Sequence, residues 1–207
     1  MNELQPLAVK PKQGGYTIVE LSIALTIIAI LIVSGIVGIS AVLRSNKANI
    51  QLEDSGRTLT RLQAYVSTTA STPNLSTAGG IGLGLFPSTR VSGSTVFNAF
   101  GTTGTASEFV NANSTASTDH NVPVNTGAIY TLTAIPTQVC ADIVVGLANL
   151  ADSIWVSSAI SGTTAPSTVT AGHVVKAPGA ALNLATLGTQ CATGTTGLVG
   201  MSFVVRP

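Results

Sequence analysis

The sequence has little charge and few aromatic residues. Of its 207 residues, 8 % are charged and 4 % are aromatic, whereas about 25 % of an ordinary soluble domain is charged. Nine Lys and Arg against eight Asp and Glu leave a net charge of +1, which is too small for a cationic surface that binds a nucleic-acid backbone. The mean hydropathy of +0.49 also argues against intrinsic disorder, which requires low hydropathy and high net charge.

Patterns typical of catalysis and metal binding are also missing. The sequence contains no Gly-x-Ser-x-Gly, His-Glu-x-x-His or Cys-x-x-Cys, and its two histidines, His120 and His173, are isolated. The glycine tract at residues 79–84 fits neither nucleotide-binding pattern, so we expect a flexible turn there. Asp142 and Asp152 lie among apolar residues and are expected to be ordinary surface or capping acids. We therefore predict no enzyme, no cofactor and no metal site.

Hydrophobicity is instead concentrated near the N-terminus. Residues 16–43 contain a single charge, Glu20, and the 23 residues from Leu21 to Leu43 are uncharged. A helix of that length extends about 34 Å, which is enough to cross a hydrocarbon core of about 30 Å. A cleaved signal peptide has an apolar region of only about 7 to 15 residues. The run therefore predicts a membrane-spanning helix.

The helical pattern continues beyond this run and becomes amphipathic. Small or apolar residues follow one another at alternating spacings of four and three, which places them on one face of a helix. These residues are Ala41, Ser45, Ala48, Leu52, Ser55, Leu59, Leu62 and Val66. Charged residues lie off that face, with Glu53 and Arg57 spaced for an i,i+4 pair. The pattern predicts one helix of about 50 residues, in which residues 16–43 are the apolar half and residues 44–67 pack on a globular domain.

The residues that open the apolar run resemble those of a known family. Gly15 is followed by Tyr-Thr-Ile-Val-Glu, which ends at Glu20, and then by an uninterrupted apolar helix. This combination resembles the processing motif of type IV pilins and pseudopilins. In that family a membrane peptidase cuts after the glycine and N-methylates the new terminus. The resemblance implies a cleaved leader of residues 1–15, a methylated N-terminus at Tyr16 and an assembly role for Glu20.

The resemblance also implies a subclass and a fold. A first mature residue of Tyr and a leader of 15 residues are more typical of the type IVb subclass. The segments at residues 96–102 and 128–150 are similar, in their order along the chain and in their residue types, to segments of bundle-forming and conjugative thin-pilus pilins. The family's fold belongs to the α+β class: a long N-terminal helix whose apolar half protrudes, and an antiparallel sheet packed on its amphipathic half. We expect residues 68–207 to form that globular head.

A carboxylate within the apolar run is costly. Its insertion at a helix centre costs about 2.5 to 3.5 kcal/mol, and somewhat less near an end. No Lys or Arg occurs between Lys12 and Arg44. Cleavage after Gly15 would create a cationic amine at Tyr16, which in a staggered filament meets Glu20 of a neighbouring copy. The alternative is that Glu20 lies at the lipid headgroups without a partner and interacts favourably with the helix dipole.

The remainder of the chain predicts a mainly β domain with one helix. Residues 67–125 are rich in Ser, Thr, Gly and Asn and are expected to form loops and short strands. Residues 128–135 read as a strand, and Pro136-Thr137 as the N-cap of a helix. Apolar residues recur there at helical spacing: Val139, Cys140, Ile143, Val144 and Leu147. Further strands are expected at residues 154–160, 168–175 and 198–205.

The two cysteines, Cys140 and Cys191, predict one disulfide, because an even count outside the cytoplasm favours pairing. The bond would close a loop of about 50 residues and stabilise the fold by about 4 kcal/mol in the chain-entropy model. The resemblance points the same way, since type IV pilins carry a C-terminal disulfide-bounded region, here residues 140–191. A metal site lacks further ligands, and nothing local supports Cys140 and His173 as a nucleophilic pair.

Together these features predict a structural role. The resemblance implies a subunit of a type IV, IVb-like pilus that is inserted among the lipids of the inner membrane and cut by prepilin peptidase. Pilus assembly machinery would then polymerise it with copies of itself into an extracellular filament for adhesion, aggregation or conjugation-type contact. One rival is a minor pilin or type II secretion pseudopilin. The other is a membrane-anchored periplasmic binding domain that does not polymerise.

Overall fold

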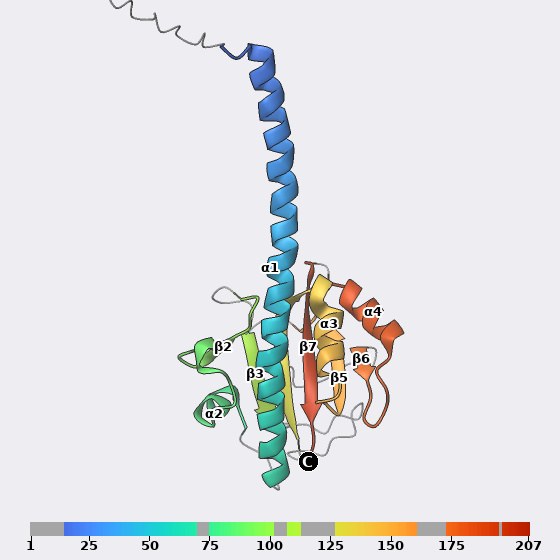
Figure 1. Cartoon of the computed structure of the whole chain (residues 1–207). Coiled ribbons are helices and arrows are strands. Elements are labelled where there is room, and N and C mark those ends of the chain that lie inside the picture. The colour runs from blue at the N-terminus through green and yellow to red at the C-terminus, as the bar shows by residue number, and fades with distance from the viewer. Residues whose placement is uncertain (1–14, 70–74, 102–106, 113–126, 161–172, 195) are drawn as a thin grey trace, which may run out of the picture. The chain divides into compact units, whose positions relative to one another are not determined.

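The chain divides into two compact units. A computed structural model describes residues 15–69, 75–101, 107–112, 127–160, 173–194 and 196–207 (Figure 1). The first unit is Met1–Leu43 and the second is Arg44–Pro207. The long helix α1 (Ile18–Thr68, 51 residues) contributes residues to both units.

The first unit contains the apolar part of α1. Every described side chain of this part is exposed, including large apolar residues such as Ile18 (88 %) and Leu31 (65 %). The helix is long and apolar enough to cross a membrane. The predicted single helix of about 50 residues is therefore confirmed in type and length.

The second unit is built on a seven-stranded antiparallel sheet. The strands lie in the order β1-β2-β3-β4-β7-β5-β6. Their bounds are β1 Val91–Ser92, β2 Thr95–Phe97, β3 Ser107–Ala112, β4 Ala128–Pro136, β5 Ser153–Ser157, β6 Val174–Lys176 and β7 Leu198–Val205. The other elements are α2 Thr77–Gly82, the 3-10 helix η1 Ser88–Arg90, α3 Thr137–Leu147 and α4 Leu184–Ala192. This arrangement confirms the α+β class, a long N-terminal helix followed by an antiparallel sheet.

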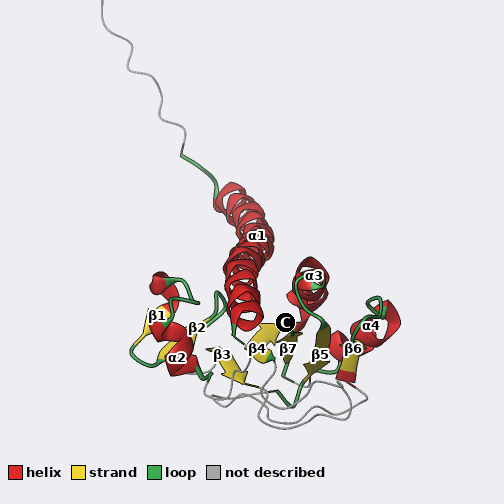
Figure 2. Cartoon of the chain, turned by 90° about the horizontal axis from the view of Figure 1, so that it is seen from below, coloured by secondary structure: helices red, strands yellow, loops and turns green. Residues whose placement is uncertain are grey.

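The second half of α1 packs across the centre of the sheet (Figure 2). The central strands β4 and β7 pair from Ala128↔Val205 to Pro136↔Leu198. Alternate residues of these strands point at the helix, and they include Tyr130, Leu132, Met201 and Phe203, all fully buried. On the helix, the predicted stripe is buried at Ala48, Ser55, Leu59, Leu62 and Val66. From Ala48 onward the stripe is thus confirmed as the face that joins α1 to the sheet, whereas its first two predicted members, Ala41 and Ser45, are exposed.

Helix α3 lies beside α1 on the same face of the sheet (Figure 2). Its five buried residues are those with the predicted helical spacing. A Cβ placed on Gly146 would lie 2.6 Å from Leu52 Cδ2, so the glycine allows α3 to approach α1 closely. The disulfide Cys140–Cys191 joins α3 to α4 across a Cα–Cα distance of 5.7 Å. The second half of α1 and the C-terminal part of the chain therefore belong to one core.

Several local expectations differ from the structure. The glycine tract is not a flexible turn: most of it forms α2, because Ser76 Oγ caps the helix by accepting from Gly79 N at 3.2 Å. At the start of α3 the N-cap is Pro136, and no side chain caps the helix. Strand β5 ends at Ser157 rather than residue 160, because the chain turns there through an Ile160 N to Ser157 O bond. Of the strand expected at 168–175, residues 168–172 lie outside the described ranges, and β6 begins at Val174.

We predict that Gly200→Ala strongly destabilises the second unit. A Cβ at Gly200, in β7, would overlap the carbonyl oxygen of Ile160, and this contact involves backbone that has no free rotation. The expected loss is about 2 to 4 kcal/mol of unfolding free energy. The matched control is Gly188→Ala, in α4, where a Cβ meets nothing within 4 Å. Helix propensity should make that variant more stable by about 0.5 to 1 kcal/mol. Denaturant unfolding of the detergent-solubilised chain measures both, and equal effects would contradict the prediction.

Candidate functional site

The start of α1 is fixed by a threonine cap. Thr17 Oγ1 accepts a hydrogen bond from the backbone N–H of Glu20 at 3.2 Å, and Thr17 O accepts from Leu21 N at 3.1 Å. This is the side-chain cap expected three residues before a Glu at a helix N-terminus. Glu20 therefore lies in the first turn of the helix, where a negative charge interacts favourably with the helix dipole. The headgroup alternative for Glu20 thus has a structural basis.

The two residues on either side of the expected cleavage point are accessible. Tyr16 is 85 % exposed. A Cβ placed on Gly15 would meet no atom within 4 Å, and the backbone of Gly15 does not adopt a positive φ. Neither packing among the described residues nor backbone geometry therefore requires glycine at this position. Recognition by another molecule would explain the residue type.

The hydroxyl groups of the apolar half are satisfied within the helix. After Thr17, each Ser or Thr hydroxyl of this half donates to a carbonyl oxygen three or four residues earlier, at 2.8 to 3.0 Å: Ser22 to Val19, Thr26 to Ser22, Ser34 to Ile30 and Ser40 to Ile36. Such bonds let hydroxyl residues enter an apolar environment. The Glu20 carboxylate differs, because no hydrogen-bond or ion-pair partner for it lies among the residues that the structure describes.

A buried polar network anchors the second half of α1 to the sheet. Glu108 of β3 is fully buried. One of its carboxylate oxygens accepts from Gln51 Nε2 at 2.8 Å, and the other accepts from the Tyr130 hydroxyl at 2.9 Å. Ser55 Oγ accepts from Gln51 Nε2 at 2.7 Å and lies 3.0 Å from the Tyr130 hydroxyl. The amide oxygen of Gln51 also accepts from Ala99 N at 2.7 Å. Helix α1 and strands β3 and β4 are thus joined by one set of hydrogen bonds.

Burial dominates the electrostatics of this network. It raises the pKa of Glu108 from 4.5 to about 7, although the hydrogen bonds from Gln51 and Tyr130 lower it. Burial, and then the Glu108 charge, raise the pKa of Tyr130 well above its ordinary value. The carboxyl therefore changes charge near neutral pH inside the core.

The sequence pattern did not indicate this network. Ser55 was expected on the buried stripe, but Gln51 was not, and the Glu108 strand has no clear alternation of polar and apolar residues. The only available signal was the position of Glu108 beside apolar neighbours in a short β-rich string. Its partners come from 22 and 57 residues away, so they were beyond local reasoning.

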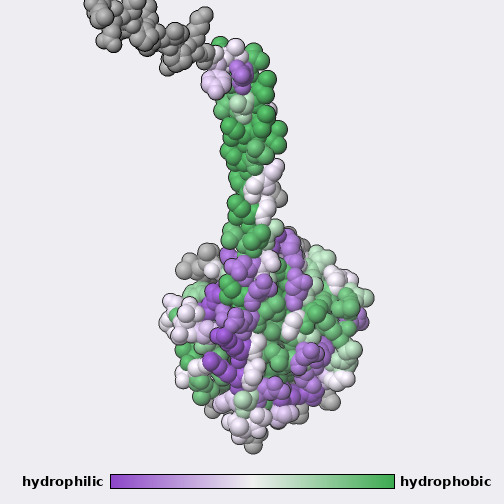
Figure 3. Space-filling view, in the orientation of Figure 1, coloured by the Kyte–Doolittle hydropathy of each residue, from purple (hydrophilic) through white to green (hydrophobic). Residues whose placement is uncertain are grey.

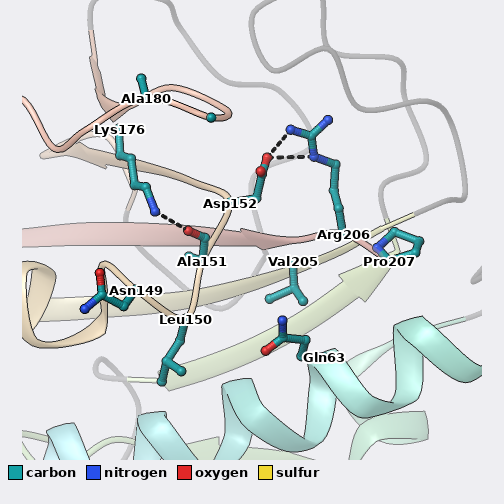
Figure 4. A pocket seen from close by; sticks show the side chains of 11 residues that line it. Gln63, Asn149, Leu150, Ala151, Asp152, Lys176, Ala180, Val205, Arg206 and Pro207 are labelled. Atoms are coloured by element: carbon teal, nitrogen blue, oxygen red, sulfur yellow. Dashed lines mark hydrogen bonds and ion pairs between the residues drawn. The ribbon is translucent and has the colours of Figure 1, made fainter.

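Several of the remaining charged residues of the second unit bind one another or the backbone. Asp54 accepts from Arg90 Nε at 2.9 Å, and Asp152 accepts from Arg206 Nε at 2.6 Å. Lys176 Nζ donates to the carbonyl oxygens of Ala148 and Ala151, both at 2.6 Å. Asp152, Arg206 and Lys176 line a hollow of about 460 Å³ (Figure 4). These side chains bind one another or the backbone, and the bonds of Lys176 stabilise the turn after α3. The hollow therefore offers little free hydrogen-bonding capacity to a ligand.

We predict that Glu108→Gln removes a pH dependence of stability. The pKa of Glu108 is higher in the folded chain than in the unfolded chain, so its stabilising contribution is complete below about pH 4.5 and is lost as pH rises through about 7. The difference between the two pKa values corresponds to roughly 3 kcal/mol. Unfolding free energies of the wild type and the variant, measured at pH 5 and pH 8, should show the variant gaining relative stability at pH 8. A constant difference would contradict the raised pKa.

One family and two solved structures are similar to this chain. Residues 10–41 match a family described as the prokaryotic N-terminal methylation motif. No curated protein matches the chain. Among solved structures, the chain is similar to TcpA, a type IV pilin from Vibrio cholerae El Tor biotype. That similarity has 17 % identity, covers 74 % of this chain and 98 % of TcpA, and has a TM-score of 0.49.

The chain is also similar to a type IVb pilin from Salmonella typhi. That similarity has 17 % identity, covers 77 % of this chain and 99 % of the Salmonella chain, and has a TM-score of 0.48. The motif match includes Gly15, Tyr16 and Glu20 and confirms the resemblance that those residues indicated. The N-terminal part of this chain, residues 10–41, thus carries a prokaryotic N-terminal methylation motif.

Proposed function

We propose that this chain is the precursor of a type IV pilus subunit that is cut after Gly15, methylated at Tyr16 and polymerised through α1. One observation carries the proposal: the residues that match the methylation motif, 10–41, include most of an exposed apolar helix that holds a single carboxylate. In water, exposure of so much apolar surface is unfavourable at about 25 cal/mol per Å². The helix therefore needs lipid around it, or copies of itself.

Cleavage links these two environments. Removal of residues 1–15 exposes a cationic α-amine at Tyr16, less than two turns from Glu20. In a helical array of copies, the amine of one copy meets the Glu20 carboxylate of another in an environment without water. Coulomb attraction is strong there, and a single unpaired charge is strongly unfavourable. The pair therefore sets the axial register between copies and gives the carboxylate the partner that it lacks among the described residues.

The second unit suits the outside of such a filament. The disulfide joins α3 to α4, as favoured in an oxidising compartment, and the charges are few, with three ion pairs among the described residues. A neutral surface rich in Ser and Thr would be exposed to the medium, where it would support adhesion, aggregation or conjugation-type contact. The route would run from the inner membrane, through the pilus assembly machinery, to the cell surface.

The first test is the mass of the mature N-terminus. Chain expressed with a prepilin peptidase should begin at Tyr16 and carry one added methyl group. Gly15→Val should block cleavage, because the chain itself leaves room for the side chain and only the peptidase would be obstructed. Gly35→Ala, also on an open part of the chain, is the control and should be cut normally. Normal processing of Gly15→Val would contradict the role of Gly15 in cleavage, and an intact leader in the wild type would favour a membrane-anchored domain that never polymerises.

The second test concerns Glu20. Glu20→Ala should remain in the membrane fraction and be processed, yet yield at least about tenfold fewer sheared filaments, since loss of about 1.4 kcal/mol per contact gives that factor. Glu20→Gln keeps the shape and removes the charge, so it should fail in the same way, whereas Glu20→Asp should recover part of the yield. Filament amounts equal to wild type in the Ala and Gln variants would refute the register role. Abundance of the wild-type chain in sheared filaments separates a major subunit from a minor pilin or pseudopilin.

A further inference from the structure

A shallow groove runs along the outer face of the second half of α1. It has a volume of about 460 Å³ and lies entirely within the second unit. Its apolar lining consists of Leu52, Gly56 and Leu150, and Gly56 lies close to Leu150, since a Cβ there would be 3.9 Å from the leucine side chain. Figure 3 shows hydrophilic atoms along this part of α1, beside a more hydrophobic surface. The groove thus combines an apolar lining with a charged rim.

The rim has an excess of positive charge. Arg57, Arg61 and Glu53 line it. Arg57 pairs with Glu53 within the helix, but the two side chains are 63 % and 64 % exposed, and such exposed pairs contribute little. Arg61 donates to the backbone oxygen of Gly84 at 2.6 Å, which leaves its charge uncompensated. An incoming carboxylate would therefore be attracted to this rim.

Helix α3 presents a ridge with the complementary character. Four exposed residues of α3 and the turn after it lie opposite its buried face, and we call them the α3 ridge: Gln138, Asp142, Val145 and Asn149. Val145 is 51 % exposed, and Asp142 stands one turn before it on the same side. Asp142 has no ion pair among the described residues. The ridge therefore offers an apolar side chain next to a free carboxylate.

We infer that the groove on α1 receives the α3 ridge of a second copy of this chain. Val145 enters over Leu52 and Gly56, and Asp142 reaches the Arg57 and Arg61 side of the rim. The inference rests on the proposed function, because it supposes that copies are brought together through their apolar helices. It identifies which faces of neighbouring globular units then meet.

The contact joins two different surfaces of the same unit. Such a heterologous contact repeats without closing when the rotation does not return to the start, which is the symmetry of a helical filament. A groove of this size accommodates only a few side chains, so the contact is weak alone. It becomes effective when the helices already hold the copies at a high effective concentration. The filament, rather than a dimer of globular units, is therefore the right object to test.

The experiment uses charge reversal in the full-length chain, with sheared filaments as the readout. Asp142→Arg and Arg57→Glu should each lower the filament yield about tenfold or more, because each places like charges together. The double variant restores opposite charges and should return to within about threefold of wild type. Lys47→Glu, an exposed cation of the same helix outside the groove, is the matched control and should assemble normally.

Folding and processing are checked separately. Each variant should form the Cys140–Cys191 disulfide and show a melting temperature close to wild type in detergent. Wild-type yields from both single variants would overturn the inference, and so would a double variant no better than the singles or an equal loss in Lys47→Glu. These results leave the proposed function intact, whereas a wild-type chain that forms no filaments removes the proposed function itself.

Discussion

The structure depends on a single constraint: an apolar helix that no described part of its own chain covers. Its first half, Ile18 to Leu43, exposes large apolar side chains along its whole length, and its hydroxyls bond only to its own backbone. Such a surface is stable only away from water. The second half of the same helix is held in a core by a stripe of apolar residues and a buried polar network. The two halves of one helix therefore suit two different environments. The boundary between them falls at Arg44, where charged residues begin.

Two carboxylates show how each environment is handled. Glu108 is buried with two hydrogen-bond donors inside the chain, and burial still raises its pKa to about 7. Glu20 stands in the apolar run with only the helix dipole and the Thr17 cap beside it. The raised pKa of Glu108 means that burial disfavours its charged form even though two donors bind it. A charged carboxylate without any donor would be still less favourable in a dry interface. The second unit offsets this cost with donors of its own, whereas in the proposed filament the charge that balances Glu20 would come from another copy of the chain.

Local periodicity was sufficient to predict the elements that carry strong patterns. The stripe on α1, the five buried residues of α3 and the strands β4 and β7 agree with the spacing of apolar residues along the chain. The short edge strands and α2 were not predicted individually, because Ser-, Thr- and Gly-rich segments have weak periodicity and their structure depends on single caps such as Ser76. The Glu108 network was missed for a different reason: its members are distant in sequence and meet only when α1 crosses the sheet.

Low charge is the property that allows these parts to act together. Loss of residues 1–15 would remove Glu3, Lys10 and Lys12, which leaves seven basic and seven acidic side chains. A subunit with no net side-chain charge does not repel its neighbours, so many copies pack closely without the self-repulsion that a highly charged protein would experience. Some of the remaining charged side chains are paired within the chain, such as Asp54 with Arg90 and Asp152 with Arg206. In the proposed filament, the specificity of contact between copies would then depend on a small number of charges, such as Glu20 in α1 and Asp142 in α3.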